Sequence, residues 1–492
     1  MIVVSLLLIP LIAAGLIVLA RQRLLIETIQ AVATIGGLGA GLTVALRVWR
    51  DGQSHMQSAA AVTAMGGLLR VDALSALMIV LITTIGAIAG LYGLGYIRAE
   101  FDRSRLGRVR LFFALFQTFI FTMLLAVTTD NLGIMWVAVE GTTLATVFLV
   151  NLHQTRASLE AAYKYLILSS VGIALAFIGT VLMYYAGSGR AGEIAVNWTS
   201  LHAAAASLNP QLVRIAFAFI LVGYGTKAGL APMHTWLPDA HSEAPAPISA
   251  MMSGVLLNVG LYALMRFKSI VDIAAGAVFA SRLLMGLGLI SLAVAAALLL
   301  AQRNYKRMLA YSSVEHIGII CLGLGFGGYW GTLGALLHVI NHALSKSAMF
   351  ILSGNILLNY RTTDIRRVRG LLRSSPIVGG AFLAGTLALM GLPPFGPFIS
   401  EFIIFRAGLE NGAQWVAMAG VGLVVVVFAG VLGSVNRMLY GSGSPVRVPR
   451  GPALARSLAP VALNFALLVL LGLALPSPLL EALRQALKVL GV

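Results

Sequence analysis

The sequence predicts an all-α polytopic membrane protein, and three observations support this fold class. Hydrophobic residues make up 59% of the 492 residues and charged residues only 10%, whereas soluble domains contain about 25% charged residues. Apolar runs of roughly twenty residues, the length that crosses a bilayer core, follow one another with short gaps. The single cysteine, Cys321, excludes a disulfide framework, a cysteine-ligated iron–sulfur cluster and a cysteine zinc site. A soluble globular enzyme is therefore excluded.

The apolar runs predict fourteen membrane-spanning helices. No basic residue precedes the first run and Arg21 and Arg23 follow it, so this run is typical of a span and not of a cleaved signal peptide. The final segment, 478–492, is too short to span and predicts a surface helix with Glu481, Arg484 and Lys488 on one side. The predicted spans are 2–20, 27–48, 71–97, 111–129, 131–152, 162–186, 211–233, 247–268, 278–301, 307–327, 329–358, 376–409, 413–438 and 458–478.

The net charge of +17 comes mainly from lysines and arginines in the gaps between spans. The gaps after odd-numbered spans hold roughly twice as many of them as the gaps after even-numbered spans, which predicts that both termini lie outside. The charge therefore indicates membrane topology and not nucleic-acid binding. The gaps are too short for an extramembrane domain and show no strand pattern, so redox or hydrolytic chemistry would need another subunit.

A faint internal repeat suggests two halves. Gly229-Leu-Ala-Pro232 in the seventh span recurs as Gly391-Leu-Pro-Pro394 in the twelfth, each five spans into a half. Five is an odd number, so the halves would have inverted topology, and paired broken helices point to a transport path between them. The predicted units are 1–110 with three spans, 111–268 and 278–438 with the two repeats, and 458–492 with the last span and the surface helix.

Several ionisable residues lie in the middle of predicted spans, where each costs roughly 2.5–3.5 kcal/mol to insert. They are Glu140, Lys227, Glu315, His316, His338, His342, Lys346 and Glu401. Three of them, His338, His342 and Lys346, follow the spacing i, i+4, i+8 and form one stripe of a helix. Such a stripe favours a proton relay over a purely structural hydrogen-bonding role.

Glu140 and Lys227 allow two interpretations. They could be an ion pair that pins two helices together, or a switch in which moving the carboxylate away lowers the proton affinity of the desolvated lysine. The proline break after Lys227 favours the switch, because unwound backbone is tolerated only beside a cavity or water. Neither interpretation is excluded by the sequence.

The motifs of nucleotide and metal enzymes are missing from the sequence. It contains no Walker loop, dinucleotide fingerprint or His-Glu-x-x-His pattern. His338 and His342 could ligate a metal, but no carboxylate shares their stripe, so neither a metal site nor a cofactor is predicted.

The segment from Lys227 to Pro245, KAGLAPMHTWLPDAHSEAP, resembles the signature of the antiporter-like subunits of respiratory complex I, which are related to Mrp-type sodium/proton antiporters. The resemblance extends to 311–318 (YSSVEHIG), 342–346 (HALSK) and 391–401 (GLPPFGPFISE). It covers the fourth to thirteenth spans. Within this superfamily, 136–140 and 155–165, together with the pair at 315–316, are most similar to the F subunits of hydrogenase-4 and formate hydrogenlyase complexes.

The resemblance implies a proton-translocating subunit without a redox centre, in a bacterial or archaeal cytoplasmic (inner) membrane. Its partners would be other membrane subunits and, through them, a peripheral redox or hydratase-like module. The transported ion would be the proton, with sodium as the alternative. The alternatives are a complex I subunit, the membrane partner of a bicarbonate-uptake complex and a stand-alone cation/proton antiporter. Two further hypotheses about function are a carrier for a small solute and a structural subunit that only anchors its partners.

The resemblance also assigns roles to residues. The implied relay is Glu140, Lys227, His316, His342, Lys346 and Glu401, with His234, His241, Asn258, Glu315 and His338 as possible accessories. Many relatives have a lysine in the eighth span, where Asn258 stands here. Asparagine cannot titrate, so water or His316 would have to bridge this step. With Asn258 and Tyr262 facing inward, we expect Leu264 to face lipid.

Overall fold

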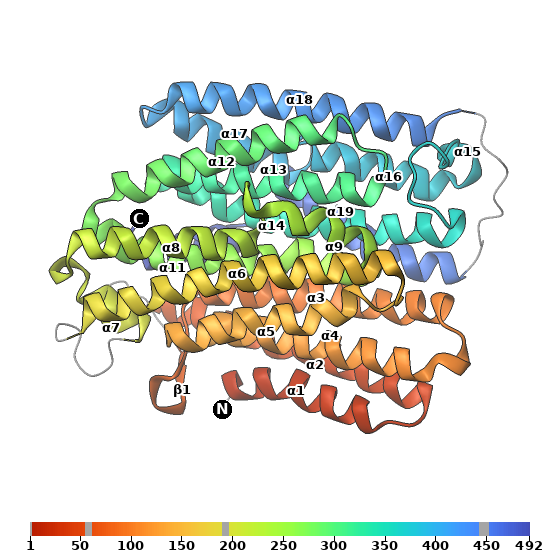
Figure 1. Cartoon of the computed structure of the whole chain (residues 1–492), viewed down its shortest axis with the longest axis horizontal. Helices are drawn as coiled ribbons and strands as arrows, with labels where there is room; N and C mark the ends of the chain where they lie inside the picture. The colour runs from red at the N-terminus through yellow and green to blue at the C-terminus, as the bar shows by residue number, and fades with distance from the viewer. Residues whose placement is uncertain (1, 55–61, 189–195, 442–451) are drawn as a thin grey trace.

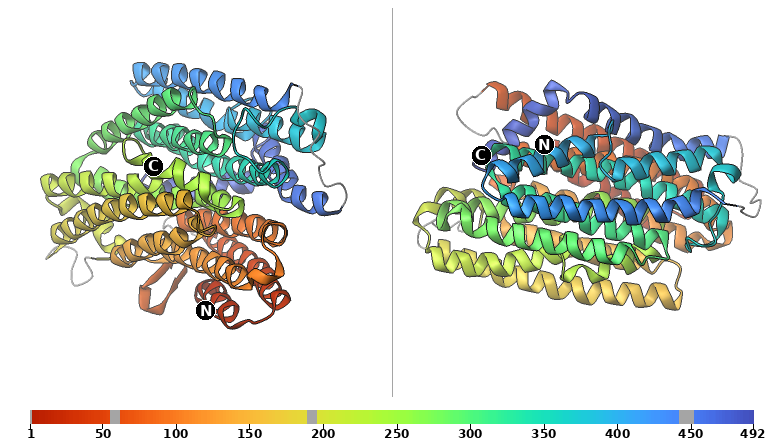
Figure 2. Two further views of the ribbon diagram at one scale, coloured as in Figure 1. Left: turned by 45° about the vertical axis from the view of Figure 1, so that its right-hand side comes forward. Right: turned by 90° about the horizontal axis from the view of Figure 1, so that it is seen from above.

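The computed structural model describes residues 2–54, 62–188, 196–441 and 452–492, and these form a single bundle of long helices lying side by side (Figures 1 and 2). The first half contains α1 (Ile2–Leu19), α2 (Arg23–Ser54), α3 (Ala73–Glu100), α4 (Leu106–Thr128), α5 (Leu132–Val150), α6 (Arg156–Gly187), α7 (Trp198–Ala203), α8 (Pro210–Ala228), α9 (Trp236–Glu243), α10 (Ala246–Met251) and α11 (Leu257–Ala275). The second half contains α12 (Ala277–Leu299), α13 (Tyr305–Phe326), α14 (Gly328–Tyr360), α15 (Leu371–Ser374), α16 (Pro376–Leu389), α17 (Gly396–Glu410), α18 (Gln414–Leu439), α19 (Pro452–Leu473) and α20 (Ser477–Val489).

The predicted fold class is confirmed, and each predicted apolar run coincides with a helix or a helix pair. In the described part of the chain, twelve helices or helix pairs are long and apolar enough to cross a membrane. The run 376–409 is divided into α16 and α17, and α19 meets α20 at an angle of 79°. That bend separates the predicted last span from the predicted surface helix. Both predicted breaks, in the seventh and twelfth spans, are present.

The expectation that the gaps contain no strand is wrong at one place. Strands β1 (Val62–Ala64) and β2 (Leu69–Val71) pair antiparallel between α2 and α3, with Val62 opposite Val71. Three-residue strands give only one alternation of side chains, which is too little for a sequence pattern to reveal. The hairpin is much too small to be an extramembrane domain.

Polar caps set the ends of several helices. Asp72 accepts from the Ser75 amide at the start of α3, and Asn131 accepts from the Ile134 amide at the start of α5. Asn304 caps α13 in the same way. Each cap satisfies amide groups that have no partner within the helix, which matters most where little water is available.

Burial divides the bundle into outer and inner helices. Outer helices such as α6 and α18 expose apolar side chains, as lipid-facing helices do. The apolar windows of α10–α11, α13 and α14 are completely buried inside the protein. The expectation that Leu264 faces lipid is therefore wrong, because its helix lies inside the bundle and the side chain is 1% exposed. These three inner segments carry Asn258 and most of the predicted ionisable residues.

Candidate functional site

The break in the seventh span places Lys227 at the end of a helix inside the bundle. Gly229 ends α8 with a φ of 84°, a left-handed conformation that favours glycine. The chain then runs without an α-helix until α9 begins at Trp236. Lys227 is completely buried, and its Nζ donates to Thr143 Oγ1 at 2.7 Å and to Tyr165 Oη at 3.1 Å.

Glu140 is linked to Lys227 through a hydroxyl group and not through a direct ion pair. Thr143 Oγ1, which accepts from Lys227, donates to Glu140 Oε2 at 3.1 Å. Ser170 Oγ donates to the other carboxylate oxygen at 2.8 Å. Glu140 is only partly buried, since α5 lies toward the outside of the bundle. The two predicted partners therefore form one connected unit that a small movement of α5 against α8 would separate.

The eighth span contains a π-helical turn, Met252–Leu256, between α10 and α11. Such turns often mark functional sites. This one contacts α14 of the second half, because His342 Nε2 lies 3.0 Å from the Ser253 carbonyl. On α11, which follows the turn, Gly260 packs closely against Ala228, the residue after Lys227. Asn258 Nδ2 donates to the Gly254 carbonyl at 2.7 Å, while its buried Oδ1 has no partner among the described residues. No direct hydrogen bond among the described residues joins Lys227 to His342.

Two histidines and a serine form a hydrogen-bonded row in the second half. The His316 and His338 rings stack with centroids 5.0 Å apart, and His316 Nδ1 lies 2.8 Å from His338 Nε2. His338 Nδ1 lies 2.9 Å from Ser400 Oγ on α17, which follows the break of the twelfth span. Glu401, the next residue, brings a carboxylate oxygen within 4.8 Å of the two rings.

The row extends to α14 through Ser400, whose Oγ accepts from Asn341 Nδ2. Each histidine nitrogen donates or accepts according to the tautomer of its ring, so the bonds between His316, His338 and Ser400 can run in either direction. A connected row of this kind can pass a proton along its length by shifting each bond. His316 Nε2 is buried and has no partner among the described residues.

Lys346 and Glu315 complete the cluster without forming an ion pair. Lys346 is completely buried and donates to Ser312 Oγ and to the Leu309 carbonyl. Glu315 Oε2 is buried without a hydrogen-bond partner among the described residues. Desolvated charged groups without a counter-ion in contact are expensive to maintain, so they are typical of a functional site.

The structure separates the remaining accessory residues from this row. His241, on α9, stacks on Phe350 at 4.9 Å, and neither ring nitrogen has a partner among the described residues. His234 lies beside Tyr311, with ring centroids 6.1 Å apart. The predicted residues thus form two groups, one around Lys227 and one around His338, with the π-helical turn between them.

The sequence reasoning missed the hydroxyl groups that connect the ionisable residues. Thr143, Tyr165, Ser312 and Ser400 each bond directly to a predicted site residue. Thr143 could have been found, since it lies one helical turn after Glu140 and so faces the same side. Ser400 could have been suspected only from its position next to Glu401.

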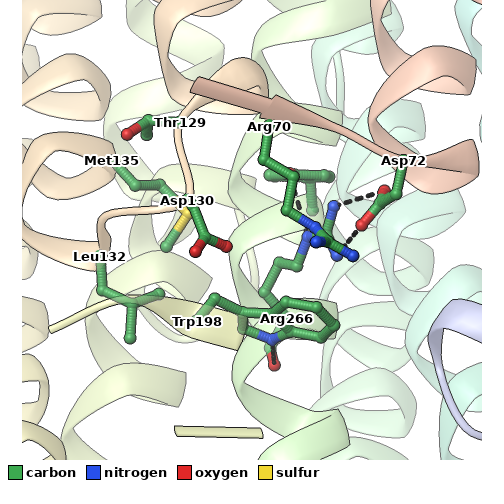
Figure 3. A pocket seen from close by; sticks show the side chains of 9 residues that line it. Arg70, Asp72, Thr129, Asp130, Leu132, Met135, Trp198 and Arg266 are labelled. Atoms are coloured by element: carbon green, nitrogen blue, oxygen red, sulfur yellow. Dashed lines mark hydrogen bonds and ion pairs between the residues drawn. The ribbon is translucent and has the colours of Figure 1, made fainter. Parts of the chain in front are cut away.

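A buried ion pair at one end of the bundle was also missed (Figure 3). The Arg266 guanidinium donates to both Asp72 oxygens at 2.7 Å and lies 4.5 Å from the Trp198 ring. Burial raises the pKa of Asp72, but the attraction of Arg266 outweighs it and the net pKa lies below the ordinary value. Arg70 and Asp130 line the same small pocket. The sequence does contain one signal for this pair. One predicted span begins beside Asp72, and another ends beside Arg266 at the same membrane face.

Two protein families match the chain. The family described as "NADH:quinone oxidoreductase/Mrp antiporter, TM" matches residues 129–427, and "NADH-Ubiquinone oxidoreductase (complex I), chain 5 N-terminus" matches residues 66–105. The first match contains all the predicted site residues.

Curated relatives agree with these families. "Hydrogenase-4 component F homolog" of Methylacidiphilum infernorum is 42% identical over 78% of this chain and 82% of the relative. "Hydrogenase-4 component B" of Escherichia coli is 32% identical over 76% of this chain, which spans only 56% of that relative. "NADH-quinone oxidoreductase subunit N" of Desulforudis audaxviator is 35% identical over 71% of this chain and 68% of the relative.

Solved structures show the same fold. A chain of the membrane-bound sulfane sulfur reductase, an archaeal respiratory membrane complex, aligns with a TM-score of 0.87 at 24% identity, over 99% of this chain and 97% of that one. A chain of the Mrp complex from Dietzia sp. gives 0.84 at 21% identity, over 99% and 96%. The matched structures are of multisubunit membrane complexes. By its family matches and its relatives, this chain belongs to the proton-antiporter family of NADH:quinone oxidoreductase and Mrp subunits.

Proposed function

We propose that this chain is the proton-translocating, antiporter-like subunit of a membrane-bound oxidoreductase complex of the hydrogenase-4 and formate hydrogenlyase type. The observation that carries the proposal is the presence of buried, hydrogen-bonded ionisable side chains inside the bundle, with Lys227 in one group and His316, His338 and Lys346 in the other. The relative named hydrogenase-4 component F homolog, at 42% identity, supports the type of complex.

In the proposed mechanism, the first group holds and releases one proton. The negative charge of Glu140 reaches Lys227 through Thr143, which favours the protonated amine. When α5 moves and this bridge opens, burial favours the neutral amine and Lys227 releases its proton. Polar groups and water around the π-helical turn then carry the proton past Asn258 toward His342.

The second group continues the path toward the break of the twelfth span. Lys346 and His342 share one stripe of α14 with His338, so a proton can move along a single helix face. The row from His316 to Ser400 then ends beside Glu401. Glu401 is the proposed exchange point with the next subunit or with water.

The proposal also covers the membrane, the topology and the partner subunits of the chain. It lies in the inner membrane of a bacterium or archaeon, with both termini outside, other membrane subunits alongside and the redox chemistry in a peripheral module. The segments 111–268 and 278–438 act as two inverted repeats, each with one broken helix. No cofactor is assigned to this chain.

The proposal is tested with the intact complex in membrane vesicles. Replacing Lys346→Met should remove proton transport, because methionine keeps the volume of the side chain and cannot carry a proton. The matched control is Lys268→Met, which removes a lysine paired with Asp272 in the last turns of α11. Normal proton transport in an assembled Lys346→Met complex would contradict the relay.

The identity of the complex is tested by purifying it intact and identifying the peripheral subunits. A hydrogenase module agrees with the proposal. An NADH dehydrogenase module or a hydratase-like module would replace the hydrogenase-4 assignment by one of the alternatives, without affecting the relay.

A further inference from the structure

The cluster of His316, His338 and Glu401 has the ligand set of a metal site. One ring nitrogen of each histidine and one carboxylate oxygen lie within 4.8 Å of one another. In a tetrahedral zinc site with bonds of about 2.0–2.2 Å, neighbouring ligand atoms are ~3.4 Å apart. Small side-chain rotations would therefore bring all three groups into bonding range. Two imidazoles and a carboxylate suit Zn²⁺ and similar divalent transition metals.

The three ligands come from three different helices, so the stripe on α14 did not reveal the site. His316 is on α13, His338 on α14 and Glu401 on α17. The carboxylate that the α14 stripe lacks is supplied by the helix after the break. All three ligands are buried, since both histidines are at most 1% exposed and Glu401 is 9% exposed.

The hydrogen bonds around the cluster prepare the ligands. Ser400 Oγ lies 2.9 Å from His338 Nδ1, an arrangement that orients a metal-binding imidazole through its other nitrogen. That nitrogen, His338 Nε2, bonds His316 Nδ1 at 2.8 Å, so Zn²⁺ would replace this hydrogen bond. His316 Nε2 is buried without a partner, and buried nitrogens are normally satisfied. Glu315 adds a second buried carboxylate next to His316, which offsets part of the charge of a divalent ion.

We propose that Zn²⁺ binds His316, His338 and Glu401 and that the bound ion blocks the proton path. Metal binding requires deprotonated ligands, so Zn²⁺ competes with protons for the same lone pairs. The blocking effect rests on the proposed function, but the binding itself does not. The site is thus an inhibitory site for divalent transition metals in the centre of the second half.

Binding is tested on the full-length chain purified in detergent, by equilibrium dialysis with radioactive Zn²⁺. The wild-type chain should bind one Zn²⁺, and His338→Ala should lose it. The matched control is His342→Ala, one helical turn away, where the histidine is equally buried but faces the Ser253 carbonyl. This control should bind Zn²⁺ as the wild type does.

A second variant keeps all three ligands and changes only their support. Ser400→Ala removes the hydroxyl that bonds His338 Nδ1 and should raise the Kd for Zn²⁺ about tenfold or more. The Kd of Ser400→Ala therefore tests the site even if His338→Ala does not fold. A wild-type chain that binds no Zn²⁺, or equal losses in His338→Ala and His342→Ala, would overturn the site.

The blocking effect is measured separately in vesicles that contain the intact complex. Proton transport by the wild type should fall over the same Zn²⁺ concentrations that fill the site. Binding without inhibition would overturn the block and leave the site standing. Absence of proton transport before Zn²⁺ is added would instead contradict the proposed function.

Discussion

At the scale of single residues, hydroxyl groups turn isolated charges into a connected path. Thr143 joins Glu140 to Lys227, and Ser400 joins His338, and through it His316, to α17. The ionisable residues stand out in the sequence because each is costly in an apolar span. The hydroxyl groups do not stand out, because serine and threonine are common in such spans and bond to their own backbone.

The Thr143 bridge leads to a prediction about coupling. Thr143→Val keeps the shape of the side chain but removes the hydroxyl, so the charge of Glu140 no longer reaches Lys227 through a hydrogen bond. We expect proton transport to fall about tenfold, equivalent to ~1.4 kcal/mol on the barrier, while assembly is unchanged. The measurement is proton transport per electron in vesicles.

The control for this variant is the adjacent threonine. Thr142 is also buried, but its hydroxyl donates only to the Val139 carbonyl. Thr142→Val should therefore leave transport within twofold of the wild type. If the two variants behave alike, the effect is one of packing and the bridge has no role in coupling.

At the scale of helices, the two breaks were predictable and the π-helical turn was not. Each break follows a glycine and contains proline, and both residues interrupt helices by known geometry. The turn at Met252–Leu256 lies in an uninterrupted apolar run, where one extra residue in a turn leaves no signal in the sequence. The burial of Leu264 was missed for a related reason, since a helix surrounded on all sides has no polar face to identify.

Asn258 permits a test of whether the π-helical turn is a polar gap in the path. We expect the Asn258→Lys complex to assemble, because Asn258 already places polar atoms at this buried position and the Gly254 carbonyl there accepts from its side chain. Leu264→Lys should fail to assemble, because it would bury a charge among apolar side chains at a cost of several kcal/mol. Assembly is measured by the yield of intact complex. Failure of Asn258→Lys alone would mean that the position is tightly packed, and the path would have to avoid it.

At the scale of the whole molecule, the sequence was sufficient for the fold class, the order of the helices and the buried charges in the middle of spans, such as Lys227 and Lys346. It was insufficient for contacts between segments far apart in the chain. Asp72 and Arg266 lie at the edges of two predicted spans, and only the packing of α3 against α11 makes them a buried pair. Glu401 likewise joins His316 and His338 only in three dimensions.

The buried pair predicts a large effect on stability at one end of the bundle. Asp72→Asn leaves the Arg266 charge buried without its partner, which typically costs about 3–5 kcal/mol. The matched control is Asp272→Asn, which breaks a more exposed pair with Lys268 and should cost less than about 1 kcal/mol. Thermal unfolding of the purified chain measures both. If the two variants lose the same stability, the buried pair of Asp72 and Arg266 contributes no more than the more exposed pair.

The same pair predicts how acid affects the fold. Because the pKa of Asp72 is lower in the folded chain than its ordinary value, this pair stabilises the fold fully above the unfolded-state pKa of about 3.9. The stabilisation is lost as the pH falls through the lower, folded-state pKa. The wild-type chain should therefore lose more stability than Asp72→Asn between pH 5 and strongly acidic conditions, and the difference between their unfolding temperatures should narrow. If it stays constant over that range, the carboxylate of Asp72 does not titrate with unfolding and Arg266 must be balanced by another group.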